Sequence, residues 1–300
     1  MPRLGRVAAI AGFFVVAVLA APSVLAADAP RLRLVSLNPS LTSILVRLGA
    51  GDSLVGIDDY SARVVPALAR LPRVGGLFDP SLEAVLALAP DRVLLVAGLE
   101  QEAHARSLRR VGLVVEVFEN ETYADVLDNI ARLGELVGRR DAGAARIAAV
   151  RATRAGVERA VRGRPRPRTL IVLDRSPLYL VGRQTFLDEL LGAVGAVNLG
   201  AGIGSGYPQA SLEWLVEAAP ELLLDLSPQA ESGASPAEFW SRWPSLPAVR
   251  QGRVVGLDAT AISLPGPDLD RALRTLARAV HGDEIDAVIA AELERAQGAR

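Results

Sequence analysis

Short runs of apolar residues alternate along the chain with longer segments in which apolar residues recur every three or four positions. In the first half the strand-like runs are 32–37, 53–58, 91–97 and 113–119, and the helical patterns are 40–50, 81–90 and 102–112. Strands separated by helices of this length predict a parallel sheet with helices on its faces. We therefore expect an N-terminal α/β lobe over residues 32–138.

The alternation stops after this lobe, because no strand-like run interrupts residues 122–162. The helical segment 139–163 has arginines on most faces and one apolar stripe, formed by Ile147, Val150, Val157 and Val161. A long helix that is mostly exposed is typical of a rigid connector. We expect this helix to join two lobes.

The alternation then resumes over residues 167–281. Strand-like runs occur at 168–174, 221–226 and 253–258, and helical patterns at 185–195, 211–220 and 268–280. The second half therefore repeats the pattern of the first and predicts a C-terminal α/β lobe, followed by a helical tail over 282–300. The expected fold is α/β, with two similar lobes of mostly parallel sheet joined by a single long helix.

One segment occurs in both halves, as SLEAVLALAPDRVLL from Ser81 and as SLEWLVEAAPELLLD from Ser211. Serine at a helix N-cap places Glu83 and Glu213 in the first turn, where free N–H groups and the helix dipole favour a carboxylate. Capping is sufficient to explain the residue types. The alternative is that two matched acids, one in each lobe, dock against a twofold-symmetric partner with basic residues.

Four aromatic residues lie near strand exits or before helices: Tyr60, Phe78, Tyr179 and Tyr207. Each alone is explained by packing, but open α/β sheets place ligand sites at these loops. The glycine-rich runs VGG and GAGIGSG are typical of loops that bring backbone close to another group. Together these features favour a ligand site between strand-exit loops of both lobes.

Residues 1–26 have the layout of a secretory signal peptide. Arg3 and Arg6 precede an apolar run, and the small-residue pattern at Val24 to Ala26 predicts cleavage after Ala26. A membrane anchor is the alternative, although the run is short for a membrane span. The chain contains no cysteine, so we expect a mature periplasmic protein without a lipid anchor or disulfide.

Composition argues against several other functions. The formal net charge of −1 gives no basic surface for nucleic acid. With His104 and His281 as the only histidines and no cysteine, the chain lacks the ligand clusters typical of metal sites, and we expect no metal and no cofactor. Neither GxSxG nor SxxK is present, so we expect no enzyme; a periplasmic α/β enzyme is the alternative from another class.

Four stretches resemble a known family: RLVSLNPSLTSILVRLGAGDSLVGIDDYS, LEAVLALAPDRVL, YPQASLE and SLPGPDL. The family is that of the substrate-binding proteins that feed vitamin B12, haem and iron-siderophore ABC importers, and the resemblance covers residues from about 33 to 280. It implies the class III periplasmic binding protein fold of the helical-backbone metal-receptor type. It also implies a monomer that delivers a small metal-chelate ligand to the transmembrane permease dimer of an importer.

Within that family the chain is most similar to cobalamin-binding members. The resemblance places Tyr60, Tyr179 and Tyr207 against a corrinoid, and Glu83 and Glu213 against arginines of the permease. Leu77 stands where those members have tryptophan, with Phe78 one residue later.

Leu264 and Asp268 stand where relatives commonly have arginine. These departures leave a ferric-siderophore or haem ligand open. A haem would need an axial ligand, which Tyr60, Tyr207 or His104 would supply only from within the cleft.

Overall fold

The computed structural model describes residues 31–227 and 233–298. The signal peptide expected at residues 1–26 lies outside the described residues. Within the described ranges, no helix combines the length and apolar character that a membrane crossing requires.

The N-terminal lobe is built on a four-stranded parallel sheet in the order β2-β1-β3-β4. Its strands are β1 (Leu34–Ser36), β2 (Leu54–Ile57), β3 (Arg92–Val96) and β4 (Val115–Phe118). Its helices are α1 (Pro39–Arg47), α2 (Asp59–Val64), α3 (Leu82–Ala87), α4 (Leu99–Arg110) and α5 (Tyr123–Leu136), with short 3-10 turns at Gly51–Ser53 and Pro66–Leu68. The strands are apolar on both faces because helices cover both faces.

Alternate residues of one strand enter different cores. Leu34 and Leu94 pack in the cluster that contains α1 and α5, whereas Val35 and Val93 pack with residues of α3 and α4. This alternation follows from the twofold periodicity of a strand. The continuous apolar runs seen in the sequence are therefore the mark of a sheet buried on both sides.

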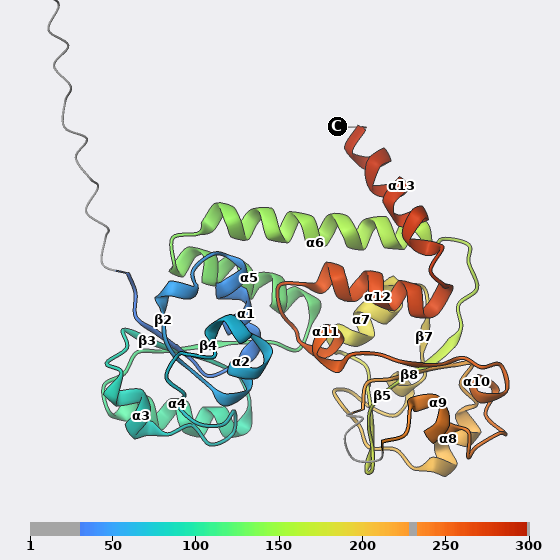
Figure 1. Ribbon diagram of the computed structural model, residues 1–300, viewed down its shortest axis with the longest axis horizontal. Coiled ribbons are helices and arrows are strands. Elements are labelled where there is room, and N and C mark those ends of the chain that lie inside the picture. The colour runs from blue at the N-terminus through green and yellow to red at the C-terminus, as the bar shows by residue number, and fades with distance from the viewer. Residues whose placement is uncertain (1–30, 228–232, 299–300) are drawn as a thin grey trace, which may run out of the picture. The chain divides into compact units, whose positions relative to one another are not determined.

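Helix α6 (Arg140–Ala160) runs along the tops of both lobes in Figure 1. Val150 and Val157 of the expected apolar stripe are fully buried, Val161 is buried and Ile147 is partly buried. The C-terminal helix α13 (Ile285–Gly298) packs on α6, where Arg159 Nε donates to Glu292 at 3.0 Å. Gly156 permits the close approach, because a β-carbon there would lie 2.9 Å from Leu293.

The C-terminal lobe has the strand order β6-β5-β8-β9, with β7 also paired to β5. The strands are β5 (Arg168–Arg175), β6 (Leu178–Leu180), β7 (Val197–Asn198), β8 (Leu222–Asp225) and β9 (Val254–Gly256). The helices are α7 (Phe186–Ala193), α8 (Leu212–Ala218), α9 (Pro236–Trp240), α10 (Pro247–Arg250), α11 (Ala259–Ser263) and α12 (Leu269–His281), with a 3-10 turn at Gly200–Gly202. All pairs are parallel except β5 with β6, an antiparallel edge that the pattern analysis missed because β6 is so short.

The repeated segment forms the same structure in each lobe. Ser81 caps α3 by accepting from the backbone N–H of Ala84 at 3.2 Å, and Ser211 caps α8 by accepting from Trp214 at the same distance. Each helix is followed by an alanine in the left-handed region, Ala89 at φ 43° and Ala219 at φ 47°. The expected capping role of both serines is confirmed.

An arginine at the start of a central strand fastens each copy of the segment. The guanidinium of Arg33 donates to Leu88 and Ala89 carbonyls, and that of Arg168 donates to the Ala218 carbonyl at 2.8 Å. The backbone N–H of Arg33 donates to Asp91 at 2.8 Å, as that of Arg168 does to Glu221 at 2.9 Å. The duplication therefore extends to the contacts that fix each helix on its sheet.

The glycine-rich run GAGIGSG packs backbone against backbone. The N–H of Gly182 donates to Gly206 O at 2.8 Å, and that of Arg183 donates to Gly204 O at 2.9 Å. A β-carbon on Gly182 would lie 2.4 Å from Gly204 O, so the approach requires glycine. The expected close approach is confirmed, and the group approached is the chain itself.

Candidate ligand-binding site

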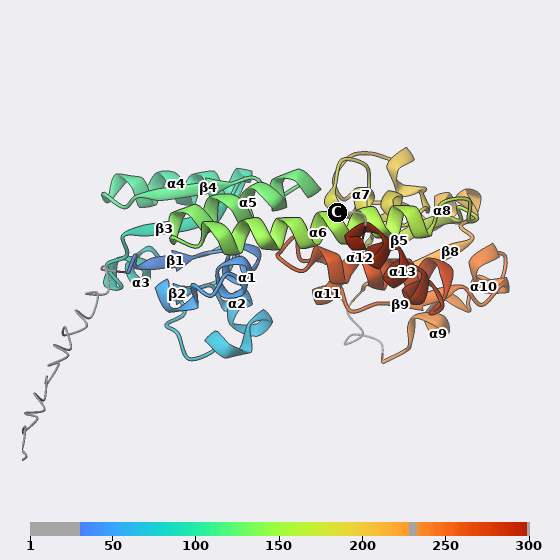
Figure 2. The same cartoon turned by 90° about the horizontal axis from the view of Figure 1, so that it is seen from above.

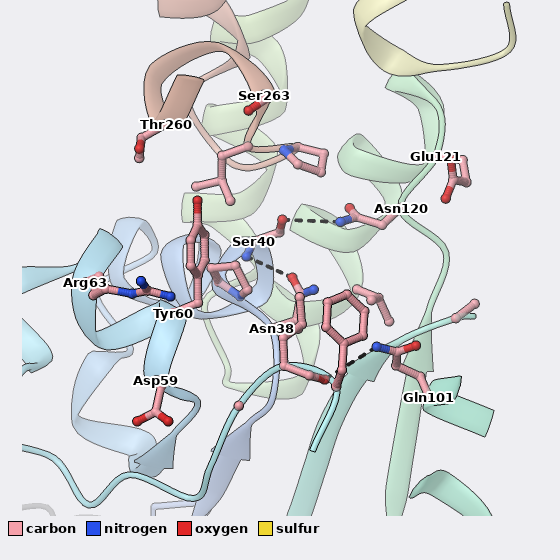
Figure 3. A pocket seen from close by; sticks show the side chains of 18 of the residues that line it. Asn38, Ser40, Asp59, Tyr60, Arg63, Gln101, Asn120, Glu121, Thr260 and Ser263 are labelled. Atoms are coloured by element: carbon pink, nitrogen blue, oxygen red, sulfur yellow. Dashed lines mark hydrogen bonds between the residues drawn. The ribbon is translucent and has the colours of Figure 1, made fainter. Parts of the chain in front are cut away.

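A cavity of about 660 Å³ lies at the carboxyl ends of the N-terminal strands and faces a segment of the C-terminal lobe. Figure 3 shows most of its lining side chains. The N-terminal lobe supplies Asn38, Pro39, Ser40, Asp59, Tyr60, Arg63, Gly76, Leu77, Phe78, Val96, Ala97, Gln101, Asn120 and Glu121, and the C-terminal lobe supplies Tyr207, Thr260, Ser263, Leu264 and Pro265. This is the edge at which parallel sheets commonly bind ligands.

Helix α2 carries Tyr60 and Arg63 into the cavity, so Tyr60 lies in a helix where the sequence suggested a loop. Tyr60 stands between α2 and the segment that bears Thr260 and Ser263 (Figure 3). The guanidinium of Arg63 lies 4.9 Å from the centroid of the Tyr60 ring. A cation above one ring face leaves the other face for an apolar ligand.

A buried polar network fixes the start of α2. The carboxylate of Asp58 accepts from the backbone N–H groups of Tyr60 and Ser61 at 2.9 Å and from the Ser61 hydroxyl. The Ser61 hydroxyl also lies 2.9 Å from Thr42 Oγ1, which donates to Ser36 at 2.8 Å. Burial raises the pKa of Asp58 above its ordinary value, although the hydrogen bonds from Ser61 and Tyr60 oppose this effect.

Leu77 and Phe78 reach the cavity from the loop before α3. Helix α4 holds the loop from behind, where the Nε2 atom of His104 lies 3.0 Å from Phe78 O. Gln101 Nε2 lies 3.5 Å from Leu77 O. His104 therefore supports the loop and is not among the residues that line the cavity, whereas Phe78 is 64% exposed and available for contact.

Tyr207 faces this site from the C-terminal lobe. Tyr207 is 42% exposed. Burial within the cleft, with a smaller contribution from the Glu121 carboxylate, raises the pKa of Tyr207 to about 12. The phenol therefore stays protonated at neutral pH. Beside it, the side chain of Asp258 caps α11 through Thr260 N at 2.9 Å and so fixes the segment that ends at Leu264 and Pro265.

Several polar lining residues were missed by the sequence analysis. Asn120 Nδ2 donates to Ser40 Oγ at 3.2 Å, and Asn38 accepts from Ser40 N at 2.9 Å. Asn38 and Asn120 both lie within two residues of a strand end. Their position after strands β1 and β4 was a usable signal, because those strands end at the same edge of the sheet.

Tyr179 lies apart from this group. It belongs to strand β6, bridges to Gln209 and is absent from the lining of the cavity. The sequence suggested a loop position for it, but the antiparallel strand holds it at the edge of the C-terminal sheet. Tyr179 is 38% exposed and forms part of the surface of that lobe.

Glu83 and Glu213 occupy matching places outside the cavity. Both are exposed at the second residue of their helices. Helices α3 and α8 lie at the lower ends of the two lobes in Figure 1, and Figure 2 shows them in separate lobes. The backbone N–H of Glu213 and the Ser211 side chain hold the pKa of Glu213 below its ordinary value.

The described residues contain no group of three or more histidine, aspartate or glutamate side chains that could hold a metal ion. A sequence model of the periplasmic binding protein family matches residues 34–261. The chain belongs to the periplasmic binding protein family. The α/β fold with two lobes of mostly parallel sheet, predicted from the sequence pattern, is confirmed for this family member.

Several known proteins similar to this chain are named for the binding of cobalamin, vitamin B12 or haem. The chain is 29% identical to a cobalamin-binding protein of Halobacterium salinarum over 84% of this chain and 70% of the relative. It is 26% identical to a vitamin B12-binding protein of Vibrio cholerae over 82% and 88% of the two chains. The solved structure of the periplasmic haem-binding protein RhuT from Roseiflexus superimposes with a TM-score of 0.72 at 26% identity, covering 86% of this chain and 99% of that one.

Proposed function

We propose that this protein is a periplasmic receptor that captures cobalamin, or a related corrinoid, between its lobes and delivers it to an ABC importer. The cavity that brings Tyr60, Leu77, Phe78 and Tyr207 together from both lobes carries the proposal. The similarity to cobalamin-binding and vitamin B12-binding proteins supports it. The function involves binding and release of an unchanged ligand and includes no catalytic step.

The chemistry of the cavity suits a large ligand with an apolar ring system and polar edges. Tyr60, Phe78 and Tyr207 offer ring faces, and Leu77 offers an aliphatic surface. Asn38, Asn120 and Gln101 offer amide groups that pair with the amide side chains of a corrinoid. Rigid aromatic contacts surrounded by amide hydrogen bonds give affinity and orientation together.

A haem or ferric siderophore is the alternative ligand of the same family. The structural similarity to a haem-binding protein supports haem as the alternative ligand. His104 lies outside the cavity lining, which leaves Tyr60 and Tyr207 as candidate axial ligands. The raised pKa of Tyr207 works against a phenolate at that position in the ligand-free protein.

Absorbance titration of the purified protein distinguishes the ligands. We expect cyanocobalamin or cobinamide to bind at micromolar concentrations or below, and haemin and a ferric hydroxamate to bind more weakly. Absence of corrinoid binding in this range would refute the proposal, and a tighter haemin complex would favour the alternative. Recovery of unmodified corrinoid from the complex tests the absence of catalysis.

Tyrosine variants test whether this cavity is the binding site. We expect Tyr60→Ala and Tyr207→Ala each to weaken corrinoid binding by about 10-fold or more, because each removes a ring from the contact surface. Tyr179→Ala is a matched comparison, since it removes the same ring at similar exposure, 38% against 39% for Tyr60. An equal loss in Tyr179→Ala would extend the binding surface onto strand β6, as the sequence resemblance implied.

We also propose that Glu83 and Glu213 dock the two lobes on basic residues of the importer permease. Their support is the matched helix position, exposure and capping in both lobes. We expect the double variant Glu83→Arg and Glu213→Arg to bind corrinoid normally and to lose binding to the permease. The control is Asp141→Arg with Glu294→Arg, two exposed acids on α6 and α13. These two helices lie in the upper part of Figure 1, whereas α3 and α8 lie in the lower part.

The location of the protein completes the proposal. We propose export by residues 1–26, cleavage after Ala26 and a mature monomeric periplasmic protein without a lipid anchor, as the cysteine-free sequence favours. Intact mass of the protein isolated from the periplasm tests the cleavage site. A mass that includes residues 1–26 in the membrane fraction would indicate a retained anchor.

A further inference from the structure

A second hollow, of about 540 Å³, lies away from the cleft at the amino ends of the C-terminal strands. The loop that leaves α6 and descends the side of the C-terminal lobe in Figure 1 forms one wall. Its other walls are the turn before β9 and the end of α12. The lining residues are Arg164, Pro165, Arg166, Pro167, Glu221, Gln251, Arg253, Val280 and His281.

Three arginines that line this hollow have no counter-charge among the described residues. Within residues 31–227 and 233–298, no carboxylate lies within ion-pair distance of Arg164, Arg166 or Arg253. The single lining carboxylate, Glu221, accepts the backbone N–H of Arg168 at 2.9 Å. The whole chain carries a formal net charge of −1, so the positive charge of this hollow is local and does not follow from an excess of basic residues in the chain.

The walls of the hollow are fixed in place. Arg253 donates to the Val280 carbonyl at 2.9 Å, which ties the turn before β9 to the end of α12. Pro165 and Pro167 restrict the backbone on either side of Arg166. The side chains of Arg164 and Arg166 have no hydrogen bond to other described residues, which leaves the five N–H donors of each guanidinium without a protein acceptor among them.

We propose that this hollow binds a phosphate-bearing anion, with guanidinium groups of Arg164, Arg166 and Arg253 as its ligands. Forked N–H donors match the oxygens of phosphate, and three of them around one concave surface favour a multivalent anion over chloride. The phosphate group belongs either to a free polyphosphate or to an anionic lipid headgroup. Neither the corrinoid site nor the docking carboxylates take part, so the proposal is independent of the proposed function.

His281 provides an internal reporter for this site. Its Nε2 atom lies 2.8 Å from Val194 O. Burial is the main cause that lowers the pKa of His281. The hydrogen bond with Val194 opposes it, and the positive charges of Arg164 and Arg253 add smaller lowering effects, with Glu284 acting the other way. An anion bound among the arginines would reduce their repulsion of the imidazolium, and the pKa of His281 should therefore rise on binding.

The test is an NMR pH titration of the two histidines in the mature protein. We expect inorganic pyrophosphate at submillimolar concentration to raise the pKa of His281 and to leave His104 unchanged, with no comparable effect of sodium chloride at the same ionic strength. Phosphatidylglycerol vesicles form the second arm, with phosphatidylcholine vesicles as their control. A response to vesicles alone assigns the phosphate to a lipid headgroup, and a response to pyrophosphate assigns it to a free anion.

The variant pair Arg164→Gln with Arg166→Gln should weaken anion binding about 10-fold or more, because it removes charged donors that hold no other part of the fold. Arg110→Gln, a change on exposed helix α4, is the matched control and should bind as the wild type does. The proposal fails if neither pyrophosphate nor anionic vesicles change His281, if chloride gives the same change, or if the double variant keeps the wild-type response. Folding of each variant is checked by circular dichroism before titration.

Discussion

A buried ion pair at the carboxyl ends of β5 and β8 allows a quantitative test of the C-terminal lobe. Arg175 Nε donates to Asp225 Oδ2 at 2.9 Å, and both side chains are buried. Trp240 Nε1 donates to the same oxygen at 2.6 Å, while Ser227 donates to the other carboxylate oxygen. Arg175 also stacks on Phe239, 4.4 Å from the ring centroid, and its Nη2 atom has no hydrogen bond to any described residue.

We expect Arg175→Met to lower the free energy of unfolding by about 3–5 kcal/mol, because it leaves the Asp225 carboxylate buried without a counter-charge. Methionine keeps much of the apolar stem, so little of this loss comes from an empty volume. The double variant Arg175→Met with Asp225→Asn removes both charges. Asparagine keeps one acceptor oxygen, for either Trp240 or Ser227, and its NH2 group stands opposite the other. Because no charge is left unpaired, the double variant should be more stable than the single variant.

Urea unfolding followed by tryptophan fluorescence measures this effect in the correct lobe, because Trp214, Trp240 and Trp243 all belong to the C-terminal lobe. Far-UV circular dichroism reports both lobes. Arg242→Met is the control, since Arg242 also stacks on Phe239, at 4.3 Å, but is exposed and has no ion pair with Asp225. Equal losses in Arg175→Met and Arg242→Met, or a double variant no more stable than the single one, would refute the reasoning.

Three further predictions follow from other contacts. Gly182→Ala should destabilise the C-terminal lobe by about 2 kcal/mol or more in urea unfolding, because the new β-carbon would lie 2.4 Å from Gly204 O. Gly192→Ala is the control: a β-carbon at Gly192 would have no atom within 4 Å, so stability should change by less than about 1 kcal/mol. Arg146→Gln should lower the unfolding free energy by about 2 kcal/mol, because this mostly buried side chain forms an ion pair with Asp270 and donates a hydrogen bond to the Pro267 carbonyl at 2.6 Å. An unchanged urea midpoint would contradict this prediction. The pKa of His281 is lowered in the folded protein, so the unfolded chain binds this proton more readily. The contribution of His281 to stability is therefore complete above its ordinary pKa of about 6.5 and falls as the pH drops below that value. His281→Gln should flatten the dependence of the unfolding free energy on pH between pH 7.5 and 5, and an identical slope would exclude this role.

The alternation of apolar runs and helical periods was sufficient to predict most of the fold. It gave the two lobes, the long helix and the capped repeats at Ser81 and Ser211, because each depends on interactions within a few residues or on a sheet buried on both faces. Strand β6 and helix α2 were missed. Both are short. Strand β6 is fixed by a distant partner, since Leu180 N donates to Pro208 O at 3.0 Å, whereas α2 begins at its own Asp58 cap, which the pattern of apolar residues does not reveal.

The candidate site was only partly predictable for the same reason. Tyr60, Phe78 and Tyr207 were selected from their loops and Leu77 from the family resemblance, and the structure brings all four to one cavity. Tyr179, selected by the same rule as the other aromatic residues, is held on a strand outside it. Asn38 and Asn120 could be assigned to the cavity only from the structure, because parallel strands bring the ends of β1 and β4 to the same edge of the sheet.

The sequence alone determined the two-lobed α/β fold and the matched carboxylates of Glu83 and Glu213, because periodicity and capping are local properties of the chain. Only the tertiary structure decided which aromatic residues share a cavity and which arginines share a hollow. Arg164 and Arg253 are far apart in the sequence and line one hollow because parallel strands begin at the same edge of the sheet.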